Sequence, residues 1–150
     1  MEAGPKKLYV DANLGCSVTI AAQWPRRFVA VPPGGAGTYA VRWMIKTSDG
    51  GHTGSLLELT RLARPYPQNA EAALQLVKRQ WPAFVVTGVD DRTPGRIDLV
   101  GHTAHLTLAV HLATLGEHWF ELVLAAPPEQ FDPLRRSFDR VAESLAALPK

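Results

Sequence analysis

The chain has 150 residues, of which 46% are hydrophobic and 20% are charged. This composition is typical of a globular domain and excludes the low hydrophobicity and high charge of a disordered chain. Sixteen Lys and Arg residues against fourteen Asp and Glu residues leave a formal charge of +2, which is too small to predict a nucleic-acid partner.

The compartment is left open by the sequence. Cys16 is the only cysteine, so no intrachain disulfide can form and the fold is expected to hold under reducing and oxidising conditions alike. No window approaches the roughly 20 apolar residues of a membrane-spanning helix, so we expect no membrane span. If Met1 is the natural start we expect a cytoplasmic protein, and if a signal segment has been removed we expect one of the bacterial cell envelope.

The first part of the chain is rich in strands. Period-two alternation and turn-forming residues predict strands at residues 7–10, 17–21, 28–31, 38–46 and 54–61, with turns at 32–35 and 48–51. The first two strands form a hairpin. The fourth of these strands, 38–46, alternates most regularly, and we expect its apolar side to face the core; that side holds Tyr39, Val41, Trp43 and Ile45.

Helical spacing enters in the second part. Apolar residues recur every three or four positions over 69–81, with Asn69 as N-cap and Pro82 as the stop. Strands are predicted at 84–89, 104–113 and 118–126, with a short one at 96–100. A last helix is expected to start with Asp132 as cap and Pro133 at its first position.

Because strands outnumber helices and are joined by short turns, the elements favour an antiparallel arrangement. We predict one α+β domain over residues 1–150, an antiparallel sheet of about six to seven strands with two amphipathic helices packed on it. In the run 104–113 the even positions are apolar and the odd ones include His105, Thr107 and His111, so one face is predicted to be core and the other solvated.

Several short sequence segments follow one another along the chain in an order that is also found in other proteins. They are Tyr9-Val10-Asp11, Leu14-Gly15-Cys16-Ser17-Val18, Trp24, Val100-Gly101-His102-Thr103-Ala104, Gly116-Glu117-His118-Trp119-Phe120, Ala125-Ala126-Pro127, Phe131, Phe138 and Ser144-Leu145. Together they cover most of the chain and resemble the Mog/PsbP-like superfamily. The chain departs from that pattern before Trp24, where Ala21-Ala22-Gln23 stands in place of the usual proline.

The resemblance implies a PsbP-like α+β domain without catalytic residues or a cofactor. Members of the superfamily include the extrinsic subunit of photosystem II, a Ran-binding nuclear import factor, bacterial envelope lipoproteins and chaperones of type VI secretion effectors. What this implies here is a binding or scaffolding domain for a protein or peptide partner. A homodimeric secretion-effector chaperone is one alternative.

A second alternative is a small hydrolase or metal-dependent enzyme that uses the histidines from His102 to His118. His105 and His111 share a strand face but would stand about 20 Å apart, too far for one metal ion. His102 could approach His105 in a bend, and His118 could approach His111 across a hairpin. No acid or cysteine stands at ligand spacing beside them and no nucleophile elbow is present, so we predict no catalytic, cofactor or metal site.

Candidate partner-binding residues come from two places. Trp24-Pro25-Arg26-Arg27 combines a large aromatic with two cations, the composition of a protein contact, although Trp24 could also close the end of the core. The solvated side of the 104–113 strand supplies the others. The set is Trp24, Arg26, Arg27, His105, Thr107 and His111.

Overall fold

The computed structural model describes residues 5–30, 37–47 and 50–149. The predicted turn at 32–35, Val31, and the first half of the turn at 48–51 lie outside these residues, as does the side chain of Tyr39. In chain order the elements are β1 (Lys6–Asp11), β2 (Cys16–Ala21), β3 (Arg26–Ala30), β4 (Gly37–Lys46), β5 (His52–Leu62), α1 (Ala70–Gln80), β6 (Val85–Asp90), β7 (Arg96–His102), β8 (Thr107–Leu115), β9 (His118–Ala126), α2 (Pro128–Ser144) and β10 (Ala146–Ala147).

Two antiparallel sheets form the scaffold. The large one has seven strands in the order β3-β4-β5-β9-β8-β7-β6, and the small one has three in the order β1-β2-β10. The prediction of an α+β fold with antiparallel strands and two helices is confirmed. The division into two sheets was not predicted, and neither was β10, which is two alanines long and carries no period.

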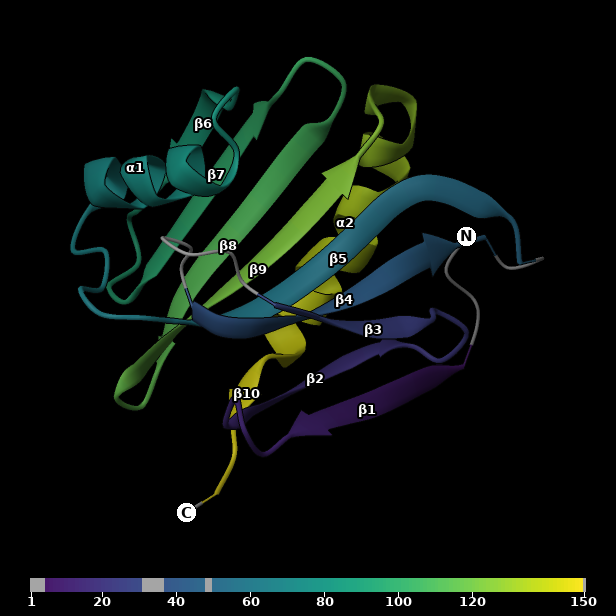
Figure 1. Cartoon of the computed structure of the whole chain (residues 1–150), viewed down its shortest axis with the longest axis horizontal. Coiled ribbons are helices and arrows are strands. Elements are labelled where there is room, and N and C mark those ends of the chain that lie inside the picture. Colours follow the sequence, from purple (N-terminus) through teal and green to yellow (C-terminus); the bar gives the residue numbers. More distant parts are fainter. Residues whose placement is uncertain (1–4, 31–36, 48–49, 150) are drawn as a thin grey trace.

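The two helices lie on opposite faces of the large sheet (Figure 1). Even-numbered residues of β9, such as Phe120 and Leu122, share a buried cluster with Phe138 of α2 and with the small sheet. Odd-numbered ones, such as Val123, belong to a second cluster with Leu76 of α1. Because successive residues of a strand point to opposite faces, β9 and its neighbours separate two cores.

Several predicted elements are confirmed. The hairpin of β1 and β2 forms, the boundaries of β9 agree with the prediction, and Asn69 is the N-cap of α1, where its Oδ1 accepts a hydrogen bond from the Ala72 N–H at 2.8 Å. On β4, Val41, Trp43 and Ile45 are buried, as the alternation predicts. Among the described residues, no helix is both long and apolar enough to cross a membrane.

The predicted start of α2 was wrong. The helix begins at Pro128, so that Asp132 and Pro133 lie inside it rather than at its cap. Proline is tolerated at a first helical position because the N–H that it lacks would have no partner there. The added turn is stabilised by Phe131, which is buried in the core cluster below α2.

The predicted solvated face of β8 was also wrong. The strand begins at Thr107, after a turn in which the Leu106 N–H donates to Thr103 Oγ1 at 3.3 Å. On the side predicted to be wet, Ala109 and His111 are 2% and 5% exposed. That side lies below α2, which packs against β8 and β9, and His111 has a hydrogen-bond partner, Asp98, on the neighbouring strand.

Candidate functional site

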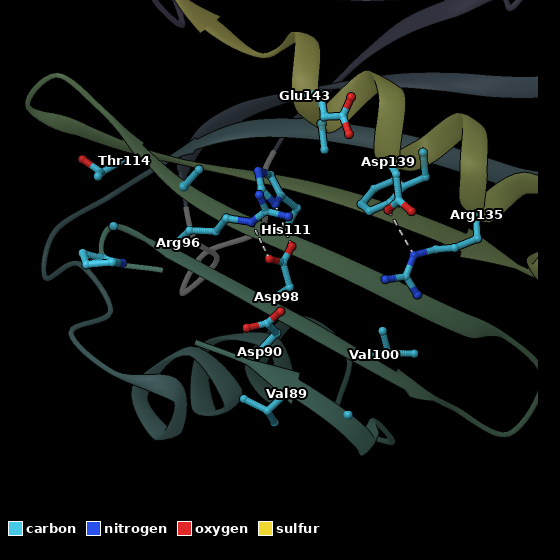
Figure 2. A pocket seen from close by; sticks show the side chains of 16 residues that line it. Val89, Asp90, Arg96, Asp98, Val100, His111, Thr114, Arg135, Asp139 and Glu143 are labelled. Carbon is cyan, nitrogen blue, oxygen red and sulfur yellow. Dashed lines mark hydrogen bonds and ion pairs between the residues drawn. The ribbon is translucent and has the colours of Figure 1, made fainter. Parts of the chain in front are cut away.

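A large hollow of the described surface lies between α2 and the strands β6, β7 and β8; we call it the α2 cleft. Its volume is about 850 Å³. Its lining consists of Gly88, Val89, Asp90, Pro94, Gly95, Arg96, Asp98, Val100, His111, Ala113, Thr114, Arg135, Phe138, Asp139, Ala142 and Glu143. Figure 2 shows ionisable side chains on both walls, with Asp90, Arg96, Asp98 and His111 on the strand side and Arg135, Asp139 and Glu143 on the helix.

A chain of three side chains crosses the strand wall of the α2 cleft. His111 Nδ1 lies 2.7 Å from Asp98 Oδ1, and Arg96 Nε donates to Asp98 Oδ2 at 2.7 Å. Burial alone raises the pKa of Asp98, but the hydrogen bonds from His111 and Arg96 outweigh burial and hold the pKa below its usual 3.8. Asp98 is therefore a carboxylate near neutral pH, so Nδ1 of His111 carries the proton and donates it.

The helix wall carries further charges. Arg135 Nε donates to Asp139 Oδ1 at 3.2 Å, one helical turn away. The side chain of Glu143 has no hydrogen bond or ion pair with any residue in the described part of the chain.

Another ion pair lies at the end of β6. Arg92 donates from Nε to Asp90 Oδ1 and from Nη2 to Asp90 Oδ2, each at 3.0 Å, and these bonds lower the pKa of Asp90 to about 2.

The structure does not bring the six sequence-predicted site residues together. Arg26 and Arg27 lie on β3, the outermost strand at one side of the large sheet, whereas His111 lies on β8, beyond β4, β5 and β9. His105 is exposed in the turn before β8, where half-buried Thr107 begins the strand. Whether these side chains contact a partner stays a prediction, and the burial of His111 removes it from the open surface.

The segment around Trp24 is partly built into the core. Trp24 is half-buried, packs against the cluster below α2 and donates from Nε1 to the Lys46 carbonyl at 3.3 Å. Arg26 lies over the rings of Tyr9 and Phe28, with its guanidinium carbon 4.9 Å and 5.5 Å from their centroids. Phe28 is 60% exposed, so this end of the sheet keeps one large apolar side chain in solvent.

The histidines do not converge. The predicted approach of His118 to His111 across the hairpin was wrong, because His118 pairs with Leu115 and His111 pairs with Leu122. His118 Nδ1 lies instead 3.4 Å from the Tyr66 hydroxyl. Within the described residues, no three side chains of His, Cys, Asp or Glu are grouped so that they could hold a metal ion.

A buried acid on β9 was not predicted from the sequence. Glu121 of β9 is 1% exposed, and its Oε1 accepts a hydrogen bond from Gln80 Nε2, at the end of α1, at 2.7 Å. Its Oε2 and the Oε1 of Gln80 have no partner among the described residues. Desolvation raises the pKa of Glu121 to about 7, against the lowering effect of the Gln80 hydrogen bond. The available signal was that Glu121 is the sole acid of β9 and that the residues on both sides of it, Trp119, Phe120 and Leu122, are apolar.

Comparisons with known proteins identify the architecture. The chain is similar to the solution structure of cyanobacterial PsbP (CyanoP) from Synechocystis, with a TM-score of 0.63 and 12% identity over 95% of this chain and 92% of that one. It is also similar to a Pseudomonas aeruginosa protein of unknown function proposed to be a regulator, with a TM-score of 0.50 and 15% identity over 98% and 100% of the two chains. No protein-family profile and no curated protein sequence matches the chain. The fold is therefore PsbP-like, and at these identities the likeness shows the fold alone.

Proposed function

We propose that this protein is a non-catalytic binding module that holds a protein or peptide partner in the α2 cleft. The observation that carries the proposal is a hollow of about 850 Å³ whose charged lining comes from both the strands and the helix. Pockets that combine apolar surface with a few placed polar groups are the usual binding sites of proteins. The apolar part of this lining includes Val100, Ala113 and Phe138.

The polar groups of the α2 cleft suit binding better than nucleophilic catalysis. Thr114 is the sole hydroxyl among the lining residues, and it donates to the Gly116 carbonyl at 3.4 Å rather than to His111. A nucleophile of this type needs a base within hydrogen-bond reach. Most of the charged side chains pair with each other, an arrangement that fixes their positions for recognition.

A second candidate function is a hydrolase in which His111 is the general base. The observation in its favour is the 2.7 Å contact with Asp98, which orients the imidazole as in known histidine–carboxylate pairs. The check is turnover of a panel of activated esters and phosphate esters. Turnover that disappears in His111→Gln supports the hydrolase, and turnover equal in both proteins assigns it to a contaminant.

The binding proposal is tested by filling the cleft. Val100→Trp adds bulk on the strand wall, and Val10→Trp on β1 is the matched control because Val10 is 53% exposed and outside the lining. A phage-displayed library of random peptides is selected against the wild-type chain, and each clone is then measured on both variants. We expect the clones to bind Val10→Trp and not to bind Val100→Trp. Circular dichroism checks that both variants are folded. Clones that bind both variants equally would overturn the proposal.

A further inference from the structure

Strand β6 offers an open sheet edge beside the α2 cleft. Within the described residues it pairs with β7 alone and ends the large sheet. An edge strand has unpaired backbone N–H and C=O groups on its outer side, and proteins commonly protect such edges with charges or proline. The sequence of β6, VVTGVD, has neither before its last residue. Val85 and Val89 are 54% and 51% exposed.

The opposite edge is protected in the usual way. Strand β3 begins with Arg26 and Arg27, and Arg26 covers part of the Phe28 ring. Charged side chains on an edge disfavour the addition of another strand. Of the two edges of the large sheet, β6 is therefore the one open to an extended segment.

A bulge limits which part of β6 can act. The pairing with β7 shifts between Val86 and Gly88, and Thr87 Oγ1 donates to the Val100 carbonyl at 3.2 Å. The part beyond the bulge, Gly88 to Asp90, lines the α2 cleft. Gly88 pairs with Val100 and Asp90 with Asp98, which also line it. Because directly paired residues share a face of the sheet, residues added opposite Gly88 or Asp90 would point to the cleft side.

The charge of the cleft defines the occupant. Four carboxylates line it, on Asp90, Asp98, Asp139 and Glu143, against two arginines, Arg96 and Arg135. Glu143 has no partner in the described part of the chain. His111, whose side chain is 6% exposed, donates from Nδ1 to Asp98. The group left without a partner is thus the Glu143 carboxylate, an acceptor that a cationic donor satisfies.

We propose that β6 takes up an extended segment of a partner protein as an additional strand, and that a Lys or Arg of this segment enters the α2 cleft. This inference rests on the proposed function and names the partner's chemistry. A second copy of the chain is disfavoured as the occupant, because pairing two β6 edges would bring two acidic clefts together. Backbone pairing supplies the affinity in such complexes, and the side-chain pocket supplies the specificity.

The test uses three synthetic peptides on the full chain. The first is Ser-Val-Thr-Val-Lys-Val-Thr-Val-Ser, the second has Glu in place of Lys, and the third keeps Lys but is N-methylated at alternate backbone positions. Titration followed by amide chemical shifts gives both the site and the affinity. We expect shifts in β6 and β7, binding of the Lys peptide about 10-fold tighter than of the Glu peptide at low salt, and weak binding of the methylated one.

Two variants locate the charge effect. Glu143→Gln is expected to reduce the preference for Lys about 3-fold. Glu129→Gln, an exposed acid of the first turn of α2 outside the lining, is expected to keep it. Equal binding of the Lys and Glu peptides, equal binding of the methylated peptide, shifts centred on β3, or no binding at all would each overturn the inference. These outcomes do not show whether the peptides selected from the library need an open cleft. The proposed function is therefore tested separately, by the binding of those peptides to Val100→Trp.

Discussion

A polar residue on a sheet faces solvent only if nothing covers it, and His111 illustrates this rule. Its position in β8 fits the alternation of a half-solvated strand, yet its side chain is 6% exposed. Burial of an imidazole is tolerated because Asp98, on the adjacent strand, accepts a hydrogen bond from it. That partner is 13 positions away in sequence and becomes visible only when the register of β7 and β8 is known.

The Asp98 carboxylate is predicted to stabilise the fold at neutral pH. Asp98→Asn removes the charge that His111 and Arg96 share, and should lower the free energy of unfolding by about 1–3 kcal/mol at pH 7. Because the pKa of Asp98 is lowered in the folded state, its contribution is present above the unfolded value of 3.8 and is lost as the pH falls through the folded pKa. Urea denaturation at pH 7 and at acidic pH measures both effects.

The matched control is Asp90→Asn. Asp90 is paired with Arg92, whose side chain is 86% exposed, and exposed pairs contribute little to stability. We expect no measurable change in the urea midpoint at pH 7. An equal loss in the two variants would show that the burial of the Asp98 network is unimportant.

Glu121 is predicted to make stability fall as the pH rises. Its pKa is about 7 in the folded state against 4.5 for the ordinary group, so between these values the unfolded chain releases a proton that the folded chain keeps. One pKa unit corresponds to about 1.4 kcal/mol, and the loss between pH 4.5 and 8 is therefore at most about 3 kcal/mol. Below pH 4.5 and above pH 7 the contribution is constant.

Glu121→Gln removes this titration while keeping the oxygen that accepts from Gln80. We expect the variant to be more stable than the wild type at pH 8 and similar to it at pH 4.5, as measured by urea denaturation. Glu129→Gln, an exposed acid of α2, should leave the pH dependence of the wild type unchanged. Parallel pH profiles for Glu121→Gln and the wild type would contradict the assignment of the buried titration to Glu121.

At the scale of elements, the packing of β7 against the start of β6 and the preceding Phe84 depends on the absence of a side chain at Gly101. A Cβ at Gly101 would collide with the Val85 carbonyl oxygen and with the Phe84 ring. Gly101→Ala should therefore cost about 2 kcal/mol or more by overpacking. Gly88→Ala is the control, because its Cβ would meet Val100 at 3.9 Å, an ordinary contact. Thermal unfolding of both variants checks this, and equal melting temperatures would contradict it.

The elements that the sequence predicts best are those with a clear signal at each end. Strand β9 lies between the turn at Gly116 and Pro127, and α1 has both a cap and a stop, so the types and boundaries of these two elements were predicted correctly. The start of α2 was not predicted correctly. Pro127 and Pro128 are typical of a turn when met in a sequence, but here they stand at the N-cap and the first position of the helix. The α2 cleft could not be predicted either, since its lining comes from α2 and from strands β6, β7 and β8, whose order in the sheet the sequence does not give.

At the scale of the whole molecule, the two cores share the strands that separate them. Buried residues of β8 and β9 belong alternately to the cluster below α2 and the cluster below α1. A structure in which one sheet supports both cores should unfold as a unit, because removing either helix exposes strands that the other core needs. For the two cores to unfold separately, the sheet would have to remain folded while the apolar side chains on one of its faces were exposed to solvent.

This cooperativity is tested with one truncation in each core. Phe138→Ala on α2 and Leu76→Ala on α1 remove side chains that are each 4% exposed. They should cost about 3–5 kcal/mol and about 2–5 kcal/mol respectively. In each variant, tryptophan fluorescence and far-ultraviolet circular dichroism should report one common midpoint in urea, shifted below that of the wild type. If Leu76→Ala instead gave an early transition in circular dichroism while the fluorescence midpoint stayed unchanged, α1 and its core would be an independently unfolding unit. In that event the energetic coupling through β8 and β9 would be weak.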